Sequence, residues 1–177
     1  MTVAVAQARV GSRAVGLVTV TSGVVGAVGV VFLGGMFAAF ALGAQALGER
    51  LGWINDLLVL ISYALAAPSV LAARNRLLPT APRLANVTAA IGLGSLAAAV
   101  VAQGLLVAGV VTFDQQIGAM SIILLALGAY FIPVGWAGSR AGVLRVGPWT
   151  GLAATLYLGF PVWTIRLGRQ LLDESGD

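Results

Sequence analysis

Residues 14–47 read AVGLVTVTSGVVGAVGVVFLGGMFAAFALGAQAL and contain no charged side chain. About 20 consecutive apolar residues are enough for a helix to cross about 30 Å of hydrocarbon. The stretch is therefore too long for one perpendicular span and too short for two spans with a turn. We expect one long helix that is tilted or bent, loosened near Gly34 and Gly35, with an end at the membrane interface.

A cleaved signal peptide is the alternative interpretation of this first segment. Arg9 and Arg13 precede it, and Ala44-Gln45-Ala46 resembles a small-residue cleavage site. The apolar run is, however, about twice the 7–15 residues of a signal-peptide core. This length favours an uncleaved first span.

Four further apolar segments follow, and the connections between them are too short to hold a soluble domain. We therefore predict an all-α fold: one polytopic integral membrane helical bundle, with a single transmembrane domain over residues 1–177. "GERLG" follows the first span and "FDQQ" is expected to turn between the third and fourth. The five predicted spans cover about residues 14–47, 53–73, 84–113, 116–138 and 148–165.

Composition supports the same fold class and excludes several chemistries. The chain is 59% hydrophobic and only 9% charged, whereas soluble domains carry about 25% charged residues. It contains no cysteine, histidine or lysine. Histidine-ligated haem or metal, lysine Schiff bases and cysteine nucleophiles are therefore excluded. We expect no cofactor and no metal site, and the scattered arginines do not suggest nucleic-acid binding.

The ten basic residues are all arginines, and they predict a topology. Short cytoplasmic loops are enriched in arginine and lysine. With a cytoplasmic N-terminus, the inside holds seven arginines and the outside three, which are Arg50, Arg166 and Arg169. We therefore expect a multi-pass protein of the bacterial cytoplasmic (inner) membrane, with its N-terminus in the cytoplasm and its C-terminus outside. The expected topology and interface anchors are Arg74, Arg76, Arg83, Arg140, Arg145, Trp53, Trp136, Trp149 and Trp163.

Gln103 is the polar residue that lies nearest the middle of a predicted span. Polar side chains within membrane helices either hydrogen-bond neighbouring helices or mark a ligand or ion pathway. Structural hydrogen bonding is one interpretation of Gln103, and a ligand or pore contact is the other. The residues that could form a polar intramembrane site with it are Ser62, Tyr63, Ser121, Tyr130 and Tyr157.

Small residues at four-residue spacing indicate close helix packing, because they let two backbones approach. The fifth predicted span carries such a row at Gly147, Gly151, Thr155 and Gly159. Packing within the bundle is one interpretation of this row, and a seam between copies of the chain is the other.

Two stretches near the end echo each other: "FIPVGWAGSR", residues 131–140, and "FPVWTIR", residues 160–166. Both run from an aromatic residue through proline, valine and tryptophan to arginine. We interpret them as two helix ends on opposite faces of the membrane.

The region from Leu125 to Gly168 resembles an uncharacterised bacterial family of multi-pass membrane proteins, a domain-of-unknown-function family. Pro133 and Gly135 match that family's Pro-x-Gly helix end, residues 139–142 (Ser-Arg-Ala-Gly) loosely match its loop, and Gly151 matches the glycine that follows. Members are usually six-helix proteins, and the arginine–serine order differs here. The resemblance implies a multi-pass fold and brings no activity with it.

The expected function is that of a non-catalytic membrane protein acting through helix–helix contacts. It would be an accessory or structural subunit of a larger membrane complex, or a homo-oligomer. Its partners would be the lipid bilayer and other membrane subunits or itself, with no nucleic acid. The alternative is a small transporter, channel or lipid-binding bundle with a polar mid-membrane site around Gln103. We do not expect an enzyme, since no nucleophile–base pair or paired carboxylates can be identified.

Overall fold

The computed structural model describes residues 3–145 and 159–176, and within these ranges the fold is entirely helical, without a strand. The predicted all-α bundle is therefore confirmed. Among these described residues, four helices are long and apolar enough to cross a membrane, namely those covering Arg13–Ala41, Gln45–Leu77, Pro82–Val107 and Phe113–Arg140. The helices of the described residues are α1 Val3–Ala41, α2 Gln45–Leu77, α3 Pro82–Val107, α4 Phe113–Arg140 and α6 Gly159–Gly176.

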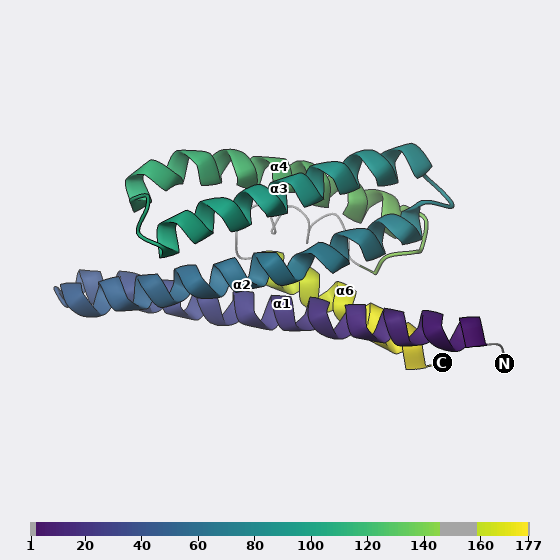
Figure 1. Cartoon of the computed structure of the whole chain (residues 1–177), viewed down its shortest axis with the longest axis horizontal. Coiled ribbons are helices and arrows are strands. Elements are labelled where there is room, and N and C mark those ends of the chain that lie inside the picture. Colours follow the sequence, from purple (N-terminus) through teal and green to yellow (C-terminus); the bar gives the residue numbers. More distant parts are fainter. Residues whose placement is uncertain (1–2, 146–158, 177) are drawn as a thin grey trace.

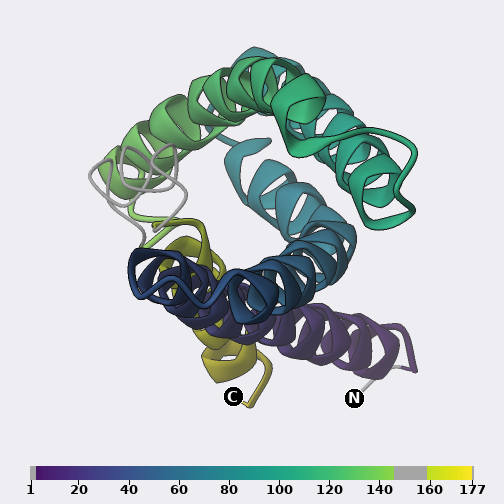
Figure 2. The same ribbon diagram turned by 90° about the vertical axis from the view of Figure 1, so that its left-hand side faces the viewer.

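The first four helices run back and forth along one axis, as Figure 1 shows. Seen from the end in Figure 2, the five helices form an arc in the order α6, α1, α2, α3, α4, and each packs mainly on the next. Within the described residues, α1 and α4 do not pack directly against each other. The described helices therefore form an open arc, and its two arms are α6 with α1 on one side and α4 on the other.

The first helical hairpin is tighter than the sequence predicted. Helix α1 stays continuous through Gly34 and Gly35 and ends at Ala41, so the expected loosening is wrong. The turn uses Gly43, whose φ of 75° lies in the left-handed region that favours glycine. Helix α2 begins at Gln45, which places "GERLG" inside a helix. The helix continues through this sequence, and its glycines pack against α1 side chains, as Gly48 does against the ring of Phe40.

The second hairpin also turns earlier than predicted. Helix α3 ends at Val107, and Gly109 takes a φ of 70° in the turn. Thr112 then caps α4 through a capping box with Gln115, in which each side chain bonds the other residue's backbone N–H. The "FDQQ" stretch, 113–116, is therefore the first turn of α4 and not the connection.

The fifth predicted span differs most from the structure. Of residues 148–165, only 159–165 lie in the described ranges, and they begin α6, which runs on to Gly176. Helix α6 is antiparallel to α1: Pro161 lies beside Gly26, Thr164 beside Gly23 and Leu172 beside Gly16. The described C-terminal end thus lies at the same end of the bundle as the N-terminus (Figure 1). The expected placement of the two termini on opposite faces does not fit this geometry.

Helix α1 holds its neighbours through hydrogen bonds and close backbone approach. Ser22 Oγ donates to the Ser62 carbonyl and Ser62 Oγ donates to the Ser22 carbonyl, each at 2.8 Å. On the α6 side, a Cβ built on Gly23 would lie 2.7 Å from the Pro161 carbonyl oxygen, and one on Gly168 would lie 2.7 Å from the Val20 nitrogen. Neither glycine can carry a side chain without moving backbone. Small residues therefore set the spacing of α6, α1 and α2.

An aromatic cluster fills the inside of the arc and joins α6 to α2 and α4. The ring centroids of Phe131 and Trp163 are 4.8 Å apart, and those of Tyr63 and Phe160 are 5.2 Å apart, both with edge-to-face geometry. Tyr130 joins the cluster at 6.0 Å from Trp163. The two echoing stretches therefore meet through their aromatic residues inside the bundle, and the interpretation as helix ends on opposite faces is wrong.

The seam between α1 and α6 gives a matched test. We expect Gly23→Ala to lower the free energy of unfolding by about 1–3 kcal/mol, because overpacking forces backbone shifts. Gly34→Ala is the control, since a Cβ at Gly34 would meet nothing within 4 Å. It should be neutral or stabilising by up to about 1 kcal/mol through helix propensity. Thermal unfolding in detergent measures both, and equal melting temperatures for the two variants would contradict the close α1–α6 approach.

Candidate functional site

Gln103 lies at the end of the bundle formed by the α1–α2 and α3–α4 turns, where it belongs to a buried polar group. Gln116 Nε2 donates to Gln103 Oε1 at 2.9 Å, linking α4 to α3. The Gln103 side chain also lies close to the Asp56 carboxylate, which accepts a hydrogen bond from Asn55 Nδ2 at 3.3 Å. Asn55, Gln103 and Gln116 are each less than 7% exposed. Three helices thus contribute to one connected polar row.

This polar row lines a groove of about 480 Å³. The polar residues occupy one side, and the other walls are apolar and come from α1, α2 and α4. Phe37, Phe113 and Ile117 form an exposed rim, each more than half exposed. The groove is therefore open on one side, and one of its otherwise apolar walls is polar. Its lining residues are Leu33, Phe37, Asn55, Asp56, Val59, Gln103, Phe113, Gln116, Ile117, Met120 and Leu124.

The polar site predicted around Gln103 does not form as a unit, because its members lie on different faces. Ser62 and Tyr63 face α1 and α6, where Ser62 bonds Ser22 and Tyr63 stacks on Phe160. Tyr130 belongs to the aromatic cluster. Ser121 is exposed on α4 and donates to the Ile117 carbonyl at 2.8 Å. Tyr157 lies outside the described residues. Of the five described members, only Gln103 lines the groove.

Asn55, Asp56 and Gln116 are the groove residues that sequence reasoning missed. The second span was expected to cover residues 53–73, which places Asp56 near its N-terminus. In the structure α2 begins at Gln45, so Asp56 lies well inside the helix. Gln116 was likewise assigned to a turn. Asn55 and Asp56 are two adjacent polar residues inside the apolar run 51–61, and this is the sequence feature that could have identified them.

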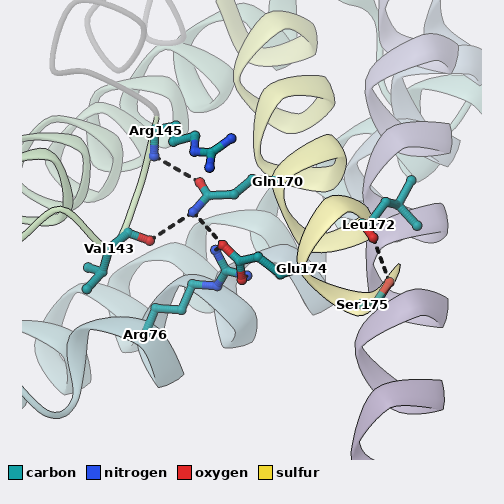
Figure 3. Close-up of polar contacts among 7 residues, drawn as sticks. All are labelled: Arg76, Val143, Arg145, Gln170, Leu172, Glu174 and Ser175. Atoms are coloured by element: carbon teal, nitrogen blue, oxygen red, sulfur yellow. Dashed lines mark hydrogen bonds and ion pairs between the residues drawn. The ribbon is translucent and has the colours of Figure 1, made fainter. Parts of the chain in front are cut away.

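The opposite end of the bundle holds a second polar network, shown in Figure 3. Gln170 of α6 accepts from the Arg145 backbone N–H at 2.9 Å and donates to the Val143 carbonyl at 3.1 Å. Its amide also donates to Glu174 at 3.0 Å, and Glu174 forms an ion pair with Arg76 of α2. The network therefore attaches α6 to the end of α2 and to the segment after α4.

The five arginines expected to mark topology lie at this same end. Arg74 and Arg76 are in the last turn of α2, and Arg140 is in the last turn of α4. Arg83 is in the first turn of α3, and Arg145 follows α4. The Arg140 guanidinium lies 4.1 Å from the Trp136 ring centroid, a cation–π contact.

The predicted tryptophan anchors have different environments. Trp53 and Trp136 are about half exposed, and their role at the membrane interface stays a prediction. Trp163 is fully buried in the aromatic cluster, so its assignment as an interface anchor is wrong. Among the described residues its Nε1 has no hydrogen-bond partner. Trp149 lies outside the described residues.

The predicted packing row also falls largely outside the described residues. Gly147, Gly151 and Thr155 lie there, and Gly159 is the buried first residue of α6. Close packing along this row, within the bundle or between copies of the chain, therefore stays a prediction.

Comparison with models of known protein families gives no match, and comparisons with curated proteins and with solved structures give none either. The resemblance of Leu125–Gly168 to an uncharacterised membrane protein family stays a prediction.

The network of Figure 3 predicts that two neighbouring polar residues differ in importance. We expect Gln170→Leu to destabilise the protein by about 1–3 kcal/mol, because it leaves the Arg145 N–H and the Val143 carbonyl without their partner. Glu174→Gln should cost less than about 1 kcal/mol, because the Glu174 side chain is half exposed and exposed ion pairs contribute little. Thermal unfolding of both variants measures the difference. A larger loss for Glu174→Gln would show that the ion pair, not the buried amide, holds α6.

Proposed function

We propose that the protein is a non-catalytic integral membrane protein that binds an apolar molecule with a polar end in the groove at Gln103. The observation that carries this proposal is the single polar row along an otherwise apolar groove. Ligand sites in proteins are typically concave and mostly apolar, with a few polar groups that orient the ligand. The volume of about 480 Å³ falls in the usual range of about 300–1,000 Å³.

The exposed rim supports entry of the ligand from the bilayer. Phe37 on α1 and Phe113 with Ile117 on α4 stand on opposite sides of the groove, and these two helices do not pack on each other within the described residues. An apolar chain can therefore reach the groove sideways between them. Asp56 is the only ionisable residue among the described residues of the lining, and these residues include no nucleophile paired with a base.

A role as an accessory subunit or a homo-oligomer is the other function that we expected from the sequence. It stays a prediction, because three of the four residues of its predicted packing row lie outside the described residues. The described groove instead favours ligand binding.

We further propose that the protein lies in the bacterial cytoplasmic membrane with both described ends on the cytoplasmic side. Helix α6 returns along α1, so Arg166 and Arg169 lie in the same half of the bundle as Arg13. Nine of the ten arginines then belong to this half, and Arg50 alone belongs to the other. This asymmetry is stronger than the seven-to-three division expected from five crossings, and it follows the preference of arginine for the cytoplasmic side.

The absence of cysteine makes this topology testable with single-cysteine variants. We expect Ser175→Cys, at the end of α6, to resist a membrane-impermeant maleimide added outside intact cells and to react after lysis. Ala44→Cys, in the turn between α1 and α2, is the matched control and should react in intact cells. Labelling of both positions from outside would contradict the proposal and support a C-terminus outside.

The groove itself can be tested with two substitutions of the same residue type on the same helix. Ile117→Trp should fill the groove and reduce bound amphiphile at least about tenfold, because an overfilled site cannot accept the ligand. Ile122→Trp is the control, since Ile122 is 70% exposed and does not line the groove. Native mass spectrometry of the detergent-purified protein, after addition of bacterial lipid extract, measures bound molecules. Equal occupancy in the two variants would overturn binding at this groove.

A further inference from the structure

We propose that the groove selects lipophilic organic cations, such as an ammonium or phosphonium group bearing apolar substituents. This inference rests on the proposed function, since it assigns a ligand class to the same groove. Asp56 is the only ionisable residue among the described residues of the lining. Among the described residues no arginine lies within ion-pair distance of its carboxylate. A ligand with a positive charge would therefore complete the site electrostatically.

The hydrogen bonds around Asp56 have a consistent direction. Gln116 donates to the Gln103 oxygen, which leaves the Gln103 NH₂ group as the part of that amide able to donate to Asp56. Asn55 donates to the same carboxylate. A carboxylate can still accept further hydrogen bonds, because its two oxygens offer about four lone-pair sites.

Charged side chains within membrane helices are costly, and they usually mark a ligand or ion pathway. Asp56 lies eleven residues after the first residue of α2, inside a helix that is long enough to span the membrane. A bound cation would offset the cost of keeping this carboxylate charged. An anionic ligand would raise that cost, because like charges repel in a medium of low dielectric constant.

The remaining walls favour an organic cation over a metal ion. Phe37 and Phe113 are both in the lining, and aromatic faces attract cations, above all quaternary ones. Met120 adds a flexible, polarisable side chain that adapts to ligands of different shape. Hard metal ions require about six oxygen ligands, and the apolar walls cannot provide them.

Tetraphenylphosphonium and tetraphenylborate test the charge preference, since they share one shape and carry opposite charges. We expect the purified protein in neutral detergent to bind the phosphonium at least about tenfold more tightly than the borate, measured by equilibrium dialysis. Asp56→Asn should remove most of this preference. Glu49→Gln is the matched control, because Glu49 is an exposed acid at the same end of the bundle that does not line the groove.

The wild-type ratio decides the question even if Asp56→Asn fails to fold. Equal binding of the two ions, tighter binding of the borate, or no binding of either would overturn cation selection. An unchanged ratio in folded Asp56→Asn would overturn the role of Asp56. The proposed groove function fails separately, when Ile117→Trp and Ile122→Trp retain the same amount of lipid.

Discussion

Helix α1 meets two neighbours through adjacent small residues, and the rest of the structure depends on this close approach. Ser22 exchanges hydrogen bonds with Ser62 of α2, while Gly23 lies against the backbone of α6. Lipid provides little driving force for bringing helices together, so short-range packing and interhelical hydrogen bonds must supply it. Reciprocal bonds of this kind form only when two backbones come close, which requires a small residue at each contact.

The close contact between α1 and α6 sets the position of α6. That position in turn determines which side chains meet in the middle of the bundle and at one of its ends. Because α6 lies antiparallel to α1, its first turn brings Phe160 and Trp163 to the rings of Phe131 and Tyr63 inside the arc. Its last turns bring Gln170 to the segment after α4. The arginines of α6 thereby join those of the other helices in one half of the bundle. One helix contact thus connects packing, charge distribution and the proposed membrane orientation.

The groove is the counterpart of this arrangement at the other end. The aromatic cluster holds α4 at a distance from α1, and the space between these helices is lined at one end by amides and a carboxylate. Gln116 Nε2 donates to Gln103 Oε1, and this hydrogen bond lowers the cost of placing the polar row in apolar surroundings. In this open arc, aromatic side chains connect α6 to α4 across the inside, and the groove proposed to bind a ligand lies at the other end of the bundle.

Much of the fold can be read from the sequence, because apolar length and the absence of charge depend on local composition alone. The run of residues 14–47 predicts a membrane helix, and the four candidate spans overlap the first four predictions. Helix ends were predicted less well. Helix α2 includes "GERLG", whose glycines pack against α1. Thr112 caps α4, which therefore begins at Phe113 and not at the predicted residue 116.

The candidate site and the course of α6 could be decided only by the tertiary structure. Gln103 was identified because a glutamine inside an apolar run is unusual in any context. The sequence does not identify Asn55, Asp56 and Gln116 as site residues, because only the packing of the helices brings these side chains together in one groove. The C-terminal segment is apolar enough to suggest a crossing. Its direction depends instead on Gly23 approaching Pro161 and Gly168 approaching Val20, which are pairs of residues more than a hundred positions apart in the sequence. Composition by itself determined that this chain belongs in a membrane. The contacts between small residues decided the direction of α6 beside α1 and the place of the polar groove. Such contacts depend on two helix faces that come together in the fold, so no single segment of the sequence specifies them.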